Sequence, residues 1–137
     1  MNYQPILQQL YPEGSIQGEC GVFCHRLVNF PLVGNTLQSK IAAVHRFGIP
    51  VAQLQGQFHP GDIIITSESK VYGHVTFVNE LVYQENTDNL LYLQLTESNF
   101  NLDLKVHHTR LLAPNSPFII GVIRGPLLFA IPENYGQ

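Results

Sequence analysis

The sequence contains no tryptophan, only two cysteines, and no run of lysine or arginine. Charged residues make up 12% of the chain and the net charge is -3, so nucleic acid is not an expected partner. Two cysteines are too few for a disulfide framework, and Cys20 and Cys24 lie one helical turn apart, where a bridge would be strained. We therefore expect two free thiols.

Long apolar runs are also missing, so we expect no membrane-spanning segment. Residues 1–5 lack the basic region and apolar run of a signal peptide, which predicts a soluble protein made in the cytoplasm that needs another route for any extracellular role. The neighbours His107 and His108 would point to opposite faces of a strand, and no further ligands are spaced to complete a zinc site. Neither a metal nor a cofactor is expected.

What the sequence does contain is a large apolar fraction, 45% of 137 residues, which is enough for one domain spanning 1–137 to bury a core. Helical periodicity and stop signals predict helices at 5–11, from 20 to the proline at 31, and from 36 or 37 to the glycine at 48. Apolar segments bounded by turn signals predict strands at 63–66, 71–81, 90–96, 102–106, 118–123 and 127–131. Helices followed by strands indicate an α+β fold with N-terminal helices packed on an antiparallel sheet.

Cys20 stands where a polar loop gives way to the second helical pattern, and the N–H groups and dipole of a helix start favour a thiolate. Thiol-based acyl transfer also needs an imidazole and a group that orients it. His74 follows Gly73 in a predicted strand, Glu97 ends the next strand, and Asn99 is two residues further on. Pairing of these strands would bring Glu97 or Asn99 beside His74, where either could accept the proton on Nδ1.

The order of these residues resembles the CHAP family, the cysteine, histidine-dependent amidohydrolases/peptidases, which are relatives of the NlpC-type cysteine peptidases within the papain-like fold. The resemblance rests on the cysteine at a helix start, Pro-Gly-Asp at 60–62, Gly-His-Val at 73–75 and Glu-x-Asn at 97–99, so it covers most of the chain. It implies a papain-like fold and a cysteine amidase or endopeptidase that cleaves the peptidoglycan stem peptide. It also implies a phage origin, with virion or lysis proteins as partners and release to the cell wall or a place in the virion.

By the same resemblance, Cys20 is the nucleophile, His74 is the general base and then the acid, Glu97 orients His74, and Asn99 supports the site. The family usually has glutamine immediately before the nucleophile, where this chain has Glu19. A carboxylate there would oppose a developing oxyanion and raise the pKa of the thiol.

Two neighbouring residues complete the predicted site. Gln17 is close enough in sequence to replace the missing glutamine as an oxyanion donor, and Tyr72 could line a substrate groove. Phe100 occupies the position where a tryptophan often follows the Glu-x-Asn motif.

Two other interpretations remain open. The chain could be a catalytically impaired module that binds cell-wall peptide or holds a place in a phage particle or secretion machine. In that case Cys20, taken alone, could be a small buried core residue. The same chemistry would also suit an intracellular hydrolase of γ-glutamyl or other small amides. Cys24 is expected to pack in the core, and His25 to lie on a solvated helix face.

Overall fold

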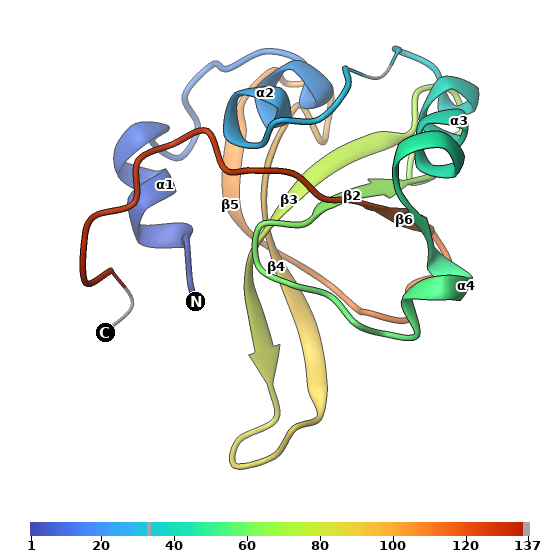
Figure 1. Cartoon of the computed structure of the whole chain (residues 1–137). Helices are drawn as coiled ribbons and strands as arrows, with labels where there is room; N and C mark the ends of the chain where they lie inside the picture. The colour runs from blue at the N-terminus through green and yellow to red at the C-terminus, as the bar shows by residue number, and fades with distance from the viewer. Residues whose placement is uncertain (33, 136–137) are drawn as a thin grey trace.

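A computed structural model describes residues 1–32 and 34–135 (Figure 1). The described helices are α1 (Gln4–Leu10), α2 (Cys20–Leu27), α3 (Leu37–Phe47) and α4 (Val51–Leu54). The described strands are β1 (Ile49–Pro50), β2 (Ile63–Thr66), β3 (His74–Tyr83), β4 (Leu90–Ser98), β5 (Val106–Leu112) and β6 (Ile119–Ile123). All neighbouring strands pair antiparallel, in the order β1-β6-β2-β3-β4-β5, so the predicted α+β fold is confirmed. No helix in the described ranges is long and apolar enough to cross a membrane.

The helices begin and end where local chemistry favours it. Thr36 and Ser39 form a reciprocal capping box at the start of α3, and Gly48 follows its last turn. Pro5 occupies the first turn of α1, where its missing N–H costs no helical hydrogen bond. Helix α2 ends at Leu27, earlier than the predicted stop at the proline, because the chain turns extended at Val28.

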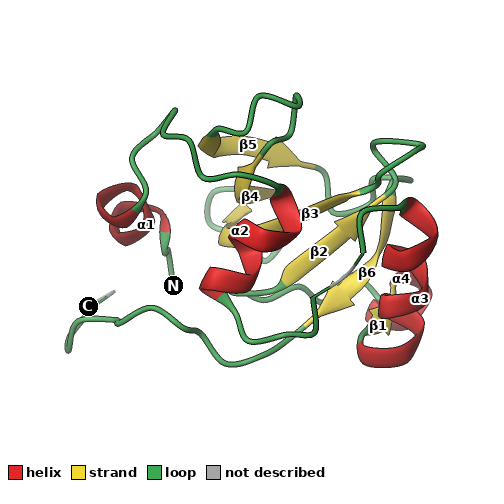
Figure 2. Cartoon of the chain, turned by 90° about the horizontal axis from the view of Figure 1, so that it is seen from above, coloured by secondary structure: helices red, strands yellow, loops and turns green. Residues whose placement is uncertain are grey.

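Two clusters of buried apolar side chains surround the sheet, and the larger cluster holds the helices that carry the site. On one face, helices α1 to α3 pack their apolar side chains against inward residues of β2 and β3, including Ile65, Val75 and Phe77. Phe23 and Leu27 of α2 are fully buried there, and each contributes roughly 1.5–3 kcal/mol of hydrophobic stabilisation. Viewed from above, α2 lies across the sheet between α1 on one side and α3 with α4 on the other (Figure 2). This packing fixes the start of α2 near the start of β3.

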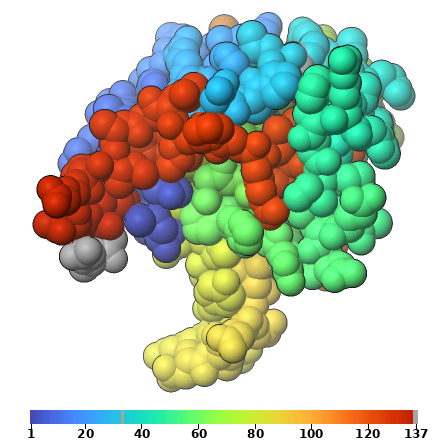
Figure 3. Space-filling model, viewed as in Figure 1, coloured from blue at the N-terminus to red at the C-terminus, as the bar shows by residue number. Residues whose placement is uncertain are grey.

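A long β3–β4 hairpin extends beyond the body of the protein (Figure 3). Only its inner half is enclosed, and it ends in a turn around residues 84–89. Two register shifts, between Val78 and Glu80 and between Val82 and Tyr83, adjust the twist of this pair. The inner half therefore carries the buried polar side chains, and the outer half carries exposed ones such as Tyr92.

Three strand predictions need correction. Strand β3 begins at His74 and not at residue 71, because Gly73 has a φ of +64° and the preceding residues form a turn. The predicted strand 102–106 is a loop in which Leu102 and Leu104 have positive φ, and the strand begins only at Val106. The predicted strand 127–131 is reduced to a single bridge between Val28 and Leu127. The apolar residues at 102–106 and 127–131 pack on the body of the protein or remain exposed, so their alternation does not indicate strand pairing.

Candidate active site

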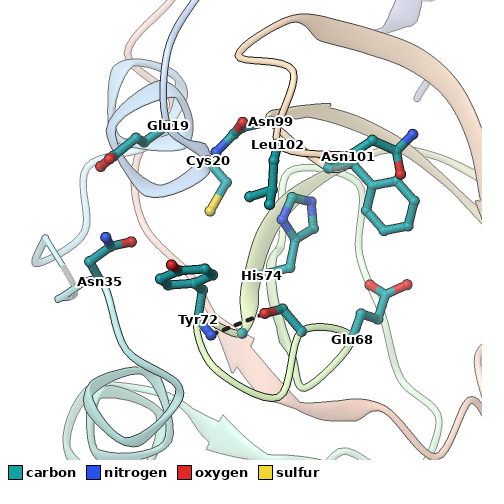
Figure 4. Close-up of a pocket in the computed structure, with 12 residues that line it drawn as sticks. Glu19, Cys20, Asn35, Glu68, Tyr72, His74, Asn99, Asn101 and Leu102 are labelled. Atoms are coloured by element: carbon teal, nitrogen blue, oxygen red, sulfur yellow. Dashed lines mark hydrogen bonds between the residues drawn. The ribbon is translucent and has the colours of Figure 1, made fainter.

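A pocket of about 400 Å³ opens where α2, the turn before β3 and the loop after β4 meet (Figure 4). Five of the residues predicted from the sequence line it, namely Glu19, Cys20, Tyr72, His74 and Asn99. The sulfur of Cys20 points into the space that Asn35, Tyr72 and His74 surround (Figure 4). Segments distant in sequence therefore converge on the predicted nucleophile.

Cys20 is the first residue of α2, as predicted. No side chain caps this helix, so the first-turn N–H groups have no side-chain acceptor and remain available to an anion. Burial raises the pKa of the Cys20 thiol, but hydrogen bonding and charge from His74, a backbone hydrogen bond with Val75 and the charge of Lys40 together bring it below the ordinary value. The environment therefore favours a thiolate.

His74 is 4% exposed, and its Nε2 lies 2.8 Å from Oε1 of Glu97. The predicted pairing of His74 with a residue of the next strand is therefore correct, but the expected nitrogen is wrong. Nε2, at the far end of the ring, reaches across to β4, which leaves Nδ1 for Cys20. Burial lowers the pKa of His74, yet hydrogen bonds and charges from Cys20 and Glu97 raise it to about 9. The imidazolium is thus favoured beside the thiolate.

Glu97 is held ionised by a partner that the sequence did not indicate. Arg110 of β5 donates from Nε to Oε2 and from Nη2 to Oε1 of Glu97, both at 2.7 Å. Burial raises the pKa of Glu97, which is 1% exposed, but hydrogen bonds and charges from Arg110 and His74 lower it overall. Arg110 also donates from Nη1 to Oε2 of Glu68 at 2.6 Å. Bidentate pairing of this kind fixes the carboxylate that orients His74.

Phe100 covers this network. The Cζ atom of Arg110 lies 3.7 Å from the centroid of the Phe100 ring, and that ring meets the His74 ring edge-on at 5.4 Å between centroids. An aromatic face over a guanidinium is favourable and keeps water from one side of the ion pairs. Phe100 therefore shields one side of the ion pairs between His74, Glu97 and Arg110.

Asn99 and Gln17 are placed differently from the prediction. The chain leaves β4 after Ser98, and Asn99 has a φ of 66°, so alternation does not carry it to the same face as Glu97. Its Oδ1 accepts a hydrogen bond from the Leu104 N–H and stabilises the loop that borders the pocket. The Gln17 side chain bonds to Ser15 and Arg26, so its amide is not directed at an oxyanion beside Cys20.

Glu19 is exposed, and its carboxylate extends away from the sulfur of Cys20 (Figure 4). Tyr72 is 42% exposed, and its ring forms one wall of the pocket. The predicted position of Tyr72 at a groove is therefore correct. The charge of Glu19 is largely screened by solvent at this exposed position.

The remaining titratable candidates have structural roles. Cys24 is fully buried, its Sγ lies 3.7 Å from the Val75 carbonyl oxygen, and burial raises the pKa of its thiol well above the ordinary value. His107 lies between Glu13 and Asp103, and His108 is fully buried, so the two point to opposite faces as predicted. His25 was expected to be solvated but is half-buried, where its ring meets Phe30 edge-on.

Both cysteines are free thiols, as predicted. In the Pro-Gly-Asp turn, Asp62 is 2% exposed and is paired with Arg124 at 2.7 Å. Gly61 has a φ of +94°, which only glycine adopts readily. This turn has a structural role at the start of β2.

Fold and site together define an α+β protein with a cysteine, histidine and glutamate aligned at one pocket. No family model, curated protein or solved structure matches the chain. Its chemistry must therefore be inferred from the side chains that meet at Cys20.

Proposed function

We propose that the protein is a cysteine amidase or endopeptidase of the CHAP and NlpC type, with a papain-like arrangement of helix and sheet, which cleaves amide bonds in bacterial peptidoglycan. The observation that carries the chemistry is the alignment of Cys20, His74 and Glu97, in which Arg110 holds the carboxylate ionised. A nucleophile, a base and an orienting group in contact are what acyl transfer through a thiol requires. The substrate class rests on the resemblance in motif order at 60–62, 73–75 and 97–99.

The first half-reaction would proceed from the ion pair. The Cys20 thiolate attacks the amide carbon, and the carbonyl oxygen becomes an oxyanion that the free first-turn N–H groups of α2 can stabilise. As the C–N bond breaks, the proton on Nδ1 of His74 passes to the leaving amine. The products are a free amine and a thioester on Cys20.

The second half-reaction would regenerate the enzyme. His74, now neutral, takes a proton from water as the water oxygen attacks the thioester carbon. Collapse of the tetrahedral intermediate releases a carboxylic acid and returns the Cys20 thiolate beside the His74 imidazolium. Glu97 keeps its charge throughout and holds the ring through Nε2.

The test is hydrolysis of purified peptidoglycan by wild-type protein under reducing conditions, followed by turbidity and by mass spectrometry of released peptides. We expect clearing by the wild type, none by Cys20→Ala, and unchanged clearing by Cys24→Ala if that variant folds. An inert wild type between pH 5 and 9 would overturn the proposal.

A second candidate is a non-catalytic module that binds cell-wall peptide or holds a place in a phage particle or secretion machine. Glu19 favours it, because this residue replaces the glutamine that would supply a side-chain donor to an oxyanion, and the Gln17 side chain is bonded to Ser15 and Arg26 instead. Iodoacetamide labelling separates the two candidates. A nucleophile predicts that Cys20 is alkylated much faster than the buried Cys24, whereas slow labelling of both favours the binding module.

A further inference from the structure

Lys40 is buried beside the candidate nucleophile without a carboxylate partner. It lies on α3 with 2% of its surface exposed, and its Nζ donates to the Gly34 carbonyl oxygen at 3.1 Å. None of the salt bridges found among residues 1–32 and 34–135 includes Lys40. An ammonium in such surroundings is costly unless an anion joins it.

The fold makes room for this lysine next to His74. A Cβ atom at Gly73 would lie 2.9 Å from Cδ of Lys40 and 3.0 Å from the Thr66 carbonyl oxygen. Gly73 therefore both turns the chain into β3 and leaves the space that the stem of Lys40 fills. The side chain is held along this path, and its ammonium reaches the Gly34 carbonyl oxygen beside a pocket that Cys20 also lines.

A second, smaller pocket of about 120 Å³ is lined by Lys40 together with Cys20, Gly34 and Asn35. Glu19, Cys20 and Asn35 also line the larger pocket, so the thiol lies where the two pockets meet. A substrate held in the larger pocket could thus extend one group past the sulfur to Lys40.

We propose that the smaller pocket is a subsite for a carboxylate of the substrate, with Lys40 as the group that binds it. This assignment rests on the proposed function, because the ligand is part of the molecule that Cys20 attacks. Two of the three ammonium donors are not used by Gly34, and a carboxylate would supply both the missing charge and the acceptors. Glu19 lines the same pocket, but it is exposed and points outward, so solvent screens its repulsion.

An anion in the smaller pocket would offset the burial of Lys40. Burial holds the pKa of Lys40 below its ordinary value, although the negative charges of Cys20 and Glu19 oppose that change. A bound carboxylate would favour the charged form further, since an opposite charge at short range stabilises the ammonium.

The test compares two alkylating reagents of similar size, anionic iodoacetate and neutral iodoacetamide. The ratio of their rates at Cys20 is measured by peptide mass mapping in wild type, in Lys40→Met, and in Lys105→Met. Methionine keeps the length of the stem and removes the charge. Lys105 is an exposed lysine whose substitution makes the same change in net charge.

We expect the iodoacetate-to-iodoacetamide ratio to fall at least about tenfold in Lys40→Met and to stay within about twofold of wild type in Lys105→Met, as a short-range buried interaction requires. An equal ratio in wild type and a folded Lys40→Met would overturn the subsite. Because the ratio is independent of the absolute rate, slow labelling by both reagents would count against the nucleophile and leave the subsite measurable. Circular dichroism verifies folding, and Lys40→Gln provides a second neutral variant should Lys40→Met not fold.

Discussion

Replacing Glu97 by glutamine tests whether the carboxylate holds His74 as an imidazolium. The rise of the His74 pKa from 6.5 to about 9 corresponds to about 3 kcal/mol of preference for the protonated ring, at about 1.4 kcal/mol for each pKa unit. Cys20 and Glu97 both contribute through hydrogen bonds and charge. If Glu97 supplies half, its neutralisation lowers the His74 pKa by about one and reduces the thiolate–imidazolium population about tenfold.

The assay is the pH dependence of iodoacetamide labelling at Cys20. We expect Glu97→Gln to slow labelling several-fold near pH 6 to 7, because fewer molecules then hold the thiolate beside an imidazolium. Glutamine can still accept from Arg110, which also keeps its contact with Glu68, so the variant should fold.

The matched control is Glu68→Gln, which removes a carboxylate from Arg110 but none from His74. We expect little change in its labelling profile. The reasoning is refuted if a folded Glu97→Gln labels with the wild-type profile, or if Glu68→Gln shifts the profile as far as Glu97→Gln does.

Three further results are expected. Hydrolysis of peptidoglycan should decline as the pH rises through about 9, because His74 then loses the proton that the leaving amine needs. The raised pKa of His74 also stabilises the fold. This contribution is fully present below pH 6.5 and is lost as the pH rises to about 9, which unfolding in urea at several pH values would detect. Gly73→Ala should destabilise the protein by clearly more than Gly56→Ala. Both glycines have positive φ, where a Cβ atom costs about 1–2 kcal/mol, but only Gly73 is also crowded by neighbouring atoms. Equal losses of stability in chemical denaturation would contradict this. Phe23→Ala should cost about 3–5 kcal/mol in the same assay, since its side chain is fully buried under α2, and a loss below about 1 kcal/mol would show that this packing is wrong.

The pairing of His74 with Glu97 could be predicted because both residues lie in strands that follow one another in sequence. Consecutive strands usually pair, and the apolar pattern marked both strands well enough to place the two residues together. Which ring nitrogen faces Glu97 could not be predicted, because it depends on where α2 places the sulfur relative to the ring. That placement comes from tertiary packing of Phe23 and Leu27 on the sheet.

The contact between Arg110 and Glu97 could not be predicted from the sequence, for a different reason. Its contact with Glu97 depends on the register between β4 and β5, which shifts between Leu95 and Glu97. The intervening loop bends through positive φ at Leu102 and Leu104, and its leucines mimic an alternating strand. An arginine in a strand at 106–112 would have indicated a partner for Glu97, but the strand was predicted at 102–106, which leaves Arg110 outside it.

Buried and half-buried charges alternate in sign along one path that begins at Cys20. From the thiolate of Cys20 the path leads to His74, Glu97, Arg110 and Glu68, and each anion on it touches a cation. Interactions among buried groups are screened far less than those of an exposed carboxylate. The ionisation of Cys20 is therefore set mainly by this path and by Lys40, and Glu19→Gln should change the labelling rate of Cys20 less than Glu97→Gln does. A larger effect from Glu19→Gln would mean that its carboxylate turns toward the sulfur in solution.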